Sequence, residues 1–225
     1  MRLLERLPQE MDRSYALRTI KENIISLELL PGSQISEKQI ANLMGLSRTP
    51  IREAMIDLSR VRIIDIIPQK RSVVSLIDYK LVEDACFMRN TLECAVVALA
   101  CKSIDLGNLY CLEENVQLQD FYVGNNNPKK MMELDNQFHK ILFDITQKTQ
   151  VYEMMQDFLI HLNRIQKLAF DANKTAEIVQ EHIMLLIAIR NRDSVKAKQL
   201  IQMHLSRHIA DVKMIRENYP QFFKQ

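Results

Sequence analysis

The chain has 225 residues, of which 47% are hydrophobic and 26% are charged, a composition typical of globular proteins that excludes intrinsic disorder. Only four glycines and six prolines occur, so folds with many tight turns are disfavoured and long helices with few connections are predicted. No apolar run approaches the roughly 20 residues of a membrane span, and the N-terminus lacks a secretory signal. We therefore expect a cytoplasmic protein with no membrane partner.

The net charge of +2 conceals an uneven distribution along the chain. Residues 1–77 carry 12 Lys and Arg against 9 Asp and Glu, a net charge of +3. Residues 78–225 carry 18 against 19, a net charge of −1. The basic first part is therefore the candidate for binding a polyanion such as nucleic acid.

The first part begins with three predicted helices. Apolar residues recur at helical spacing over residues 14–27. Ser36, followed three residues later by Gln39, forms a capping box for a short second helix that ends at Gly45. Ser47 then caps a third helix. Two short helices joined by a tight, glycine-containing turn predict a helix-turn-helix.

A small hairpin is predicted after the third helix. The β-branched runs at 63–67 and 72–76 flank Pro68-Gln69-Lys70-Arg71, which gives the hairpin a basic tip. Three helices followed by such a hairpin make a winged helix-turn-helix, which we expect over residues 1–77.

The rest of the chain shows only helical patterns. We expect an antiparallel all-α bundle of about six helices over residues 78–225, so the predicted fold class is mainly α. The expected helices are 79–102, 106–122, 128–146, 149–169, 174–191 and 193–217.

The start of the third helix carries side chains that a recognition helix uses. Arg48 and Arg52 lie four residues apart on one face, and arginine can bind guanine or phosphate at two points. Ser47 and Thr49 can bond phosphate beside the helix N-terminus. Candidates for flanking phosphate contacts are Lys38, Lys70 and Arg71. From spacing alone, a solvated basic face explains these residues as well as DNA binding does.

The segment PGSQISEKQIANLMGLSRTPIREAMIDLSRVRII resembles the N-terminal domain of GntR-family transcriptional regulators and follows the family pattern nearly throughout. The DNA-contacting residues that this resemblance implies are Arg48 and Arg52, assisted by Ser47, Thr49 and Lys38. The chain departs from the family at the wing tip, where 69–72 reads QKRS in place of the usual glycine. This departure puts the wing's close approach to the minor groove in question, whereas its charge suits phosphate contact.

Three of the five histidines lie on the apolar sides of their predicted helices, namely His139, His182 and His204, and Asp135 precedes His139 by one turn. Buried polar side chains need partners. These four can satisfy one another by binding a cation, and a set of three nitrogens and one oxygen suits Zn²⁺, Ni²⁺, Mn²⁺ or Fe²⁺. The residues alone leave this open against four separately satisfied core side chains. His208, one turn after His204, is an equal candidate by spacing.

Residues 78–217 resemble the FCD ligand-binding domain of one large GntR subfamily, through the segments FMRNTLECAVVALA, LDNQFHKILFDIT, EHIMLLIAI and MHLSRHI. In that domain an Asp and three His hold a metal. The matching positions here are Asp135, His139, His182 and His204. Arg89 shares the apolar face of its helix, where an ion pair with Glu93 and contact with a ligand are both compatible with the spacing. The resemblance favours an arginine that binds an effector carboxylate.

The predicted function is a metabolite-responsive transcriptional repressor that binds a pseudo-palindromic double-stranded operator as a homodimer. A small organic acid would complete the coordination of the metal with the help of Arg89, and thereby change the affinity for DNA. A metal-dependent enzyme acting on a small organic acid and a metal-only sensor are the alternatives. We expect no catalytic residues, because no general base with spacing such as HExxH is present and Glu181 lies off the cavity face.

Overall fold

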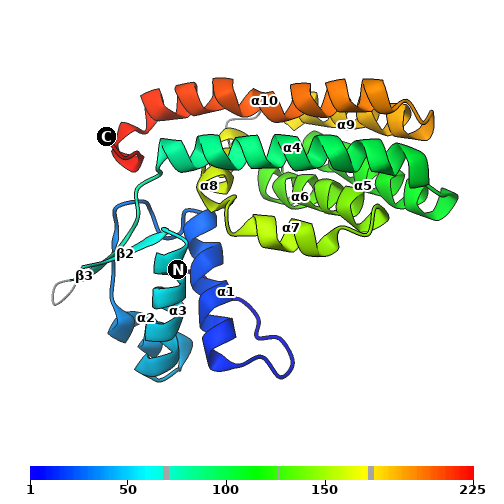
Figure 1. The fold of residues 1–225 in the computed structure, drawn as a ribbon. Helices are drawn as coiled ribbons and strands as arrows, with labels where there is room; N and C mark the ends of the chain where they lie inside the picture. Colours follow the sequence, from blue (N-terminus) through cyan, green and yellow to red (C-terminus); the bar gives the residue numbers. More distant parts are fainter. Residues whose placement is uncertain (68–70, 126, 172–174) are drawn as a thin grey trace. The chain divides into compact units, whose positions relative to one another are not determined.

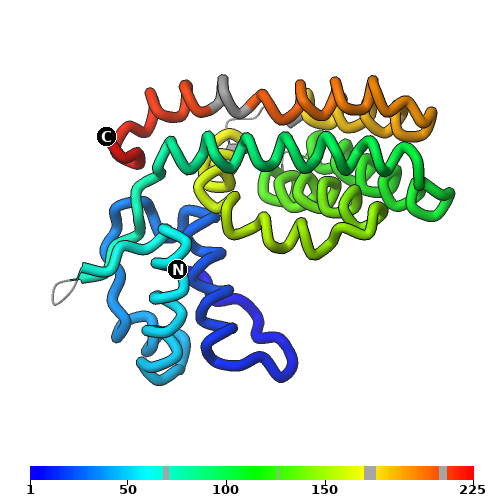
Figure 2. The backbone as a smooth tube through the Cα atoms, viewed as in Figure 1, coloured from blue at the N-terminus to red at the C-terminus, as the bar shows by residue number. Residues whose placement is uncertain are grey.

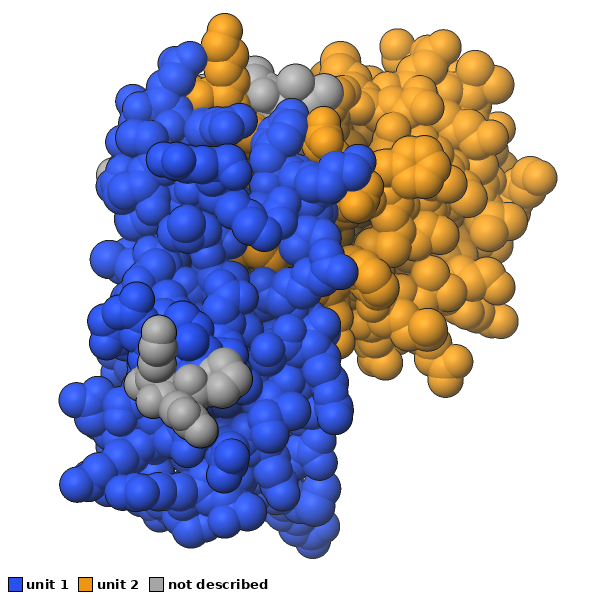
Figure 3. All heavy atoms as spheres, turned by 60° about the vertical axis from the view of Figure 1, so that its left-hand side comes forward, with its two compact units in different colours: residues 1–81, 216–225 blue, residues 82–215 orange. Residues whose placement is uncertain are grey.

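The computed structural model divides into two compact units (Figure 3), residues 1–81 with 216–225, called unit 1, and residues 82–215, called unit 2. The residues it describes are 1–67, 71–125, 127–171 and 175–225, without the side chains of 170, 171, 175 and 208–211. These units are defined by compactness alone. They do not test the domain boundary that we expect at residue 77, which stays a prediction. The fold class is confirmed, because a winged helix-turn-helix is followed by a helical bundle (Figure 1).

Unit 1 is built on three helices, α1 (Asp12–Ile25), α2 (Glu37–Met44) and α3 (Arg48–Arg60). Helix α3 packs against both of the others. Its buried side chains recur at helical spacing and form one face, Ile51, Ala54, Met55 and Leu58. The opposite face of α3 is consequently left for solvent or a partner.

The two serines predicted as helix caps behave differently. Ser36 accepts a hydrogen bond from the backbone N–H of Gln39 at 3.4 Å, so its hydroxyl caps α2 as predicted. Gly45 ends α2 at a φ of 67°, a left-handed conformation that glycine adopts without strain. Ser47 occupies the N-cap position of α3, but its side chain makes no capping bond.

The wing belongs to a three-stranded antiparallel sheet with the strand order β1-β3-β2. Strands β2 (Ile64–Ile67) and β3 (Arg71–Val74) form the predicted hairpin, and its tip lies outside the described residues. Strand β1 (Gln34–Ile35) adds a third strand beside β3. A strand of two residues is too short to show an alternating pattern, so this strand was not predicted.

The last residues of the chain fold back onto unit 1. The backbone N–H of Ile77 donates to Phe222 at 2.8 Å, and that of Lys224 donates to Ile77 at 3.0 Å. Phe223, which pairs with Ile77, is buried. Figure 2 shows the red C-terminal end beside the segment that follows β3. The tail therefore completes the unit that begins at residue 1.

The bundle contains seven helices in the described residues, where about six were predicted (Figure 1). They are α4 (Tyr79–Ser103), α5 (Leu106–Gly124), α6 (Pro128–Ile145), α7 (Thr149–Gln156), α8 (Ile160–Asp171), α9 (Thr175–Arg190) and α10 (Ser194–Asn218). Helix α5 packs against α6 and α9, and α6 also packs against α7 and α8. No helix in the described ranges is both long and apolar enough to span a bilayer.

The extra helix arises because the predicted helix 149–169 is broken between α7 and α8. Neither glycine nor proline marks this break. In α7 only Tyr152 and Met155 are buried, whereas every residue from 159 to 165 is buried. The break therefore coincides with a change from a half-exposed helix to an enclosed one.

The two cap serines make a matched test of the local structure. We expect Ser36→Ala to lower the free energy of unfolding by about 0.5–1 kcal/mol, because the N–H of Gln39 loses its acceptor. Ser47→Ala should leave stability unchanged, because its hydroxyl makes no capping bond. Urea denaturation followed by circular dichroism measures both, and equal losses would contradict the difference in capping.

Candidate functional site

The candidate DNA-binding residues lie on the solvent side of unit 1. Ser47, Arg48, Thr49 and Arg52 are all exposed at the N-terminal end of α3. The hydroxyl of Ser47 is not used in capping, so it can bond a phosphate. The packing of α3 explains this placement, since its apolar face is turned towards α1 and α2.

Arg48 and Arg52 differ from other arginines of unit 1 in their charge environment. Arg13 and Arg60 both form ion pairs with Asp57, at 2.6 and 3.0 Å. In the described part of the chain, Arg48 and Arg52 have no ion pair, so their guanidinium groups stay available to an anionic partner.

Of the three candidates for flanking phosphate contacts, the structure describes two. Lys38 is exposed in the first turn of α2, and Arg71 is exposed at the start of β3. Lys70 lies outside the described residues. The assignment of all seven residues to DNA contact stays a prediction.

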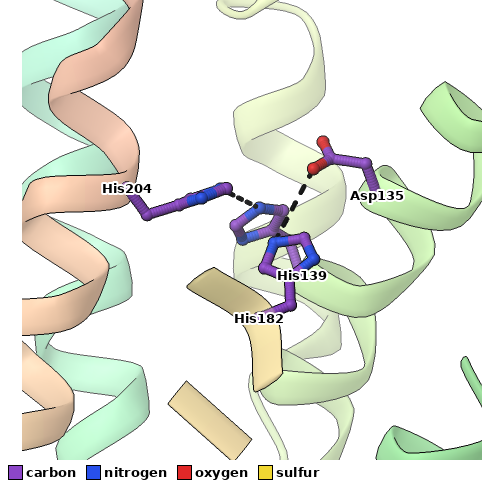
Figure 4. Close-up of side chains that lie close together, drawn as sticks. All are labelled: Asp135, His139, His182 and His204. Atoms are coloured by element: carbon purple, nitrogen blue, oxygen red, sulfur yellow. Dashed lines mark hydrogen bonds and ion pairs between the residues drawn. The ribbon is translucent and has the colours of Figure 1, made fainter. Parts of the chain in front are cut away.

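The four candidate metal ligands come together in unit 2 (Figure 4). Asp135 and His139 lie one turn apart on α6, His182 comes from α9, and His204 comes from α10. One ligand atom from each of the four lies within 4.8 Å of the others, and all four residues are buried. The side chain of His208, the alternative by spacing, lies outside the described part of the chain.

Short distances join these ligand atoms. The Nε2 atoms of His139 and His204 are 3.2 Å apart, and Nε2 of His182 is 3.7 Å from Oδ1 of Asp135. The ring of His182 stacks on Phe138, with centroids 4.1 Å apart. Nε2 of His182 is fully enclosed and has no hydrogen-bond partner among the residues that the structure describes. Such an orphaned atom, aimed at the other three ligands, fits a cation site.

Each imidazole contacts a second polar group through its other nitrogen. Nδ1 of His139 lies 2.6 Å from Oε2 of Glu93 on α4. Nδ1 of His182 lies 2.7 Å from Oε1 of Gln119 on α5. Nδ1 of His204 lies 2.9 Å from Oε2 of Glu181 on α9.

These outer contacts fix the hydrogens on the rings. All three outer atoms are acceptors, so each Nδ1 donates and each neutral ring carries its lone pair on Nε2. The amide of Gln119 has the matching orientation, because its Nε2 donates to Asn115 at 2.7 Å. Two Nε2 lone pairs at 3.2 Å repel each other unless a cation or a proton lies between them. Three nitrogens and one carboxylate oxygen suit Zn²⁺, Ni²⁺, Mn²⁺ or Fe²⁺.

The charge states support this arrangement. Burial lowers the pKa of His182 well below its ordinary value, and the charges of the neighbouring histidines and Arg89 lower it further. Burial also lowers the pKa of His139, although Glu93 opposes this shift. Burial alone would raise the pKa of Glu93, but Arg89 and His139 outweigh it and lower this pKa to about 2. The two rings are thus neutral beside an ionised carboxylate.

Arg89 forms the ion pair that its spacing allowed. Its Nε donates to Oε1 of Glu93 at 2.6 Å, and both side chains are buried. In the described residues its two Nη nitrogens make no hydrogen bond, and neither is completely enclosed. Asp135 lies close enough to raise the pKa of Arg89 together with Glu93, against the effect of burial. Arg89 therefore presents free donors near the four ligands.

Sequence reasoning missed the outer acceptors Gln119 and Glu181, and it recognised Glu93 only as a partner of Arg89. Gln119 shares the buried stripe of α5 with Leu112 and Val116. A polar residue on an otherwise apolar stripe was the available signal. Glu181 was placed off the cavity face, and it does lie outside the four ligands, although it is buried against His204.

Comparison with known sequences identifies both parts of the chain. The family described as "FCD domain" matches residues 84–207, and the family described as "Bacterial regulatory proteins, gntR family" matches residues 15–74. The transcriptional repressor RspR of Escherichia coli K12 is 27% identical over 209 residues, which cover 92% of each protein. The Nta operon transcriptional regulator of Aminobacter aminovorans is 23% identical over 188 residues, 84% of this chain and 88% of that protein.

Solved structures show the same fold. Escherichia coli McbR/YncC has a TM-score of 0.79 at 19% identity, covering 92% of this chain and 99% of that chain. A GntR structure from Rhodococcus sp. RHA1 has a TM-score of 0.74 at 19% identity, covering 90% and 97%. The FCD match alone spans more than half of the 225 residues. The chain therefore belongs to the GntR family of bacterial transcriptional regulators and carries an FCD domain after its winged helix.

Proposed function

We propose that this regulator is a repressor whose affinity for its operator is controlled by a small organic acid bound at a metal site in unit 2. The observation that carries the proposal is the convergence of three Nε2 atoms and the carboxylate of Asp135. Each Nδ1 already has its acceptor, so the inner atoms are matched to a divalent cation.

The charges around this site favour an anionic effector. Glu93 is paired with Arg89, and Glu181 is paired with Arg207 at 2.8 Å. Arg207 also pairs with Glu177, but that side chain is 72% exposed, so among the enclosed groups alone each pair is neutral. Asp135 is left with one negative charge, and a divalent cation changes the total to one positive charge. A carboxylate neutralises that charge and accepts hydrogen bonds from the Nη nitrogens of Arg89. A monovalent or divalent organic acid is therefore the expected class of effector.

Control of DNA binding follows from linkage. The bound metal supplies a positive centre that attracts the carboxylate of the effector. Arg89 orients this carboxylate, and the ligands on α6, α9 and α10 respond to its presence. If the effector binds one conformation of the protein more tightly, it shifts the population towards that conformation, and DNA binding changes by the same coupling free energy.

At the operator, Arg48 and Arg52 read bases or phosphates in the major groove while Ser47, Thr49, Lys38, Lys70 and Arg71 bond the backbone. A homodimer places two such helices on a pseudo-palindromic site. The name of RspR describes that relative as a repressor, which supports the same direction of regulation here.

An enzymatic role is the weaker alternative. A metal-dependent hydrolase or isomerase needs a general base within reach of the reacting group. Of the carboxylates described around the ligands, Glu93 is engaged by Arg89 and His139, and Glu181 by His204 and Arg207. A metal-only sensor would keep the ligands and bind no organic acid.

The DNA assignment is tested on fragments selected from random double-stranded DNA by the wild-type protein. We expect Arg48→Ala and Arg52→Ala each to weaken binding about tenfold or more, since a two-point arginine contact is worth roughly 1–3 kcal/mol. Arg60→Ala, on the same helix but paired with Asp57, should bind as the wild type does. Gel shifts measure all three, and undiminished binding by both test variants would refute the assignment.

The metal assignment is tested by elemental analysis of reconstituted protein. The wild type should hold one divalent metal ion per chain, and His139→Ala and His182→Ala should lose it, because each removes a nitrogen ligand. His161→Gln, a buried histidine outside the ligand group, should keep it. Stoichiometric metal in the double variant His139→Ala/His182→Ala would show that the metal is held elsewhere.

The effector assignment is tested by a thermal-shift screen of small organic acids on metal-loaded protein. A true effector raises the melting midpoint by mass action. We expect Arg89→Gln to weaken that acid roughly tenfold or more, because it loses a charge-assisted hydrogen bond worth about 1.5–3 kcal/mol. Arg190→Gln, which alters an exposed arginine paired with Glu113, is the control. Wild-type affinity in Arg89→Gln would exclude the carboxylate-binding role.

A further inference from the structure

The outer acceptors of the three imidazoles differ in charge and exposure. His139 has a carboxylate, Glu93, whose side chain is 1% exposed. His182 has a neutral amide, Gln119, which is fully buried. His204 has a carboxylate, Glu181, whose side chain is 11% exposed. The three candidate nitrogen ligands therefore differ in the charge and the exposure of the group that accepts from Nδ1.

Glu93 is held on both of its oxygens. Oε1 accepts from Nε of Arg89 at 2.6 Å, and Oε2 accepts from Nδ1 of His139 at 2.6 Å. Arg89 lies one turn before Glu93 on α4, so this helix brings the carboxylate and its counter-charge together. A buried carboxylate with two charge-assisted or short hydrogen bonds has little freedom to move.

A carboxylate that accepts from Nδ1 acts on the metal through the ring. It fixes the tautomer, sets the orientation of the ring and raises the basicity of Nε2. We propose that Glu93 is a positioning residue that holds His139 ready for the metal, and that it sets the metal affinity more strongly than Glu181 does. This inference rests on the metal site of the proposed function.

The difference between the two glutamates follows from their surroundings. Glu181 and its partner Arg207, whose side chain is 25% exposed, lie near solvent. When Glu181 is neutralised, water can take the hydrogen of Nδ1 on His204. The pair of Glu93 and Arg89 is buried, at 1% and 6%, so no solvent can substitute at His139.

The test uses the full-length, metal-free protein and Co²⁺ alone. Dissociation constants are measured by competition with a chromophoric chelator, and the coordination is followed in the visible absorption of the bound Co²⁺. Glutamine has one acceptor oxygen for the two donors that Glu93 accepts from, Nε of Arg89 and Nδ1 of His139, so one of them loses its acceptor. We therefore expect Glu93→Gln to weaken Co²⁺ binding about 10- to 100-fold, the usual effect of disturbing an outer-shell partner. Glu181→Gln is the matched control, with the same chemical change at a more exposed acceptor, and should weaken binding less than Glu93→Gln does.

Folding is controlled separately, because Glu93→Gln leaves Arg89 buried without a counter-charge. Melting of the metal-free proteins reports any general loss of stability. The double variant Arg89→Met/Glu93→Gln removes both charges and should show the same loss of Co²⁺ affinity. If the single variant does not fold, the double variant decides the result.

The outcomes separate this inference from the function on which it rests. Wild-type protein that binds no Co²⁺ would refute the metal site itself. If the wild type binds Co²⁺, and folded Glu93→Gln or the double variant has a dissociation constant within twofold of the wild-type value, the positioning role is overturned. Equal losses of Co²⁺ affinity in Glu93→Gln and Glu181→Gln would refute the inference that the more buried glutamate has the larger effect. A loss confined to Glu93→Gln and the double variant, with an altered Co²⁺ spectrum, would support the proposal.

Discussion

Burying an imidazole away from water is costly unless both ring nitrogens find partners, and the centre of unit 2 has to meet this demand for three converging rings, His139, His182 and His204. The outer nitrogen of each ring is satisfied by a side chain from α4, α5 or α9. The inner nitrogens converge with Asp135, where lone pairs face one another. The protein's own side chains thus satisfy the outer nitrogens, and the inner nitrogens lie in an arrangement that could hold a cation.

This constraint also explains which polar residues the helical core tolerates. Glu93 can be buried because Arg89 neutralises it from one turn away on the same helix. Gln119 can be buried because Asn115 accepts from its amide, and Asn115 in turn donates to the carbonyl of Leu134. The polar residues form two hydrogen-bonded chains, one linking α4 with α6 and the other linking α5 with α6 and α9. Such chains help to specify how these helices pack.

The sequence predicted the features that carry a local pattern or a motif. Helix-turn-helix, hairpin and the four converging residues all carried periodic or motif signals. The break between α7 and α8 carried none, because burial on all sides of 159–165 is a property of the assembled bundle. The roles of Gln119 and Glu181 were missed for a similar reason, since an outer acceptor is defined by a partner some 23 to 63 positions away. The pairing of Arg89 with Glu93, four residues apart, was within reach of helical spacing.

The C-terminal tail has a consequence for how this protein is made. Unit 1 contains the first 81 residues and the last ten, and Phe222, Phe223 and Lys224 pair with Ile77. Ribosomes deliver the winged helix early, but its contacts with residues 222–224 form only after the intervening bundle has been translated. Until then, unit 1 of the nascent chain lacks residues 216–225. Unit 1 is therefore begun before the bundle is made and is completed only after it.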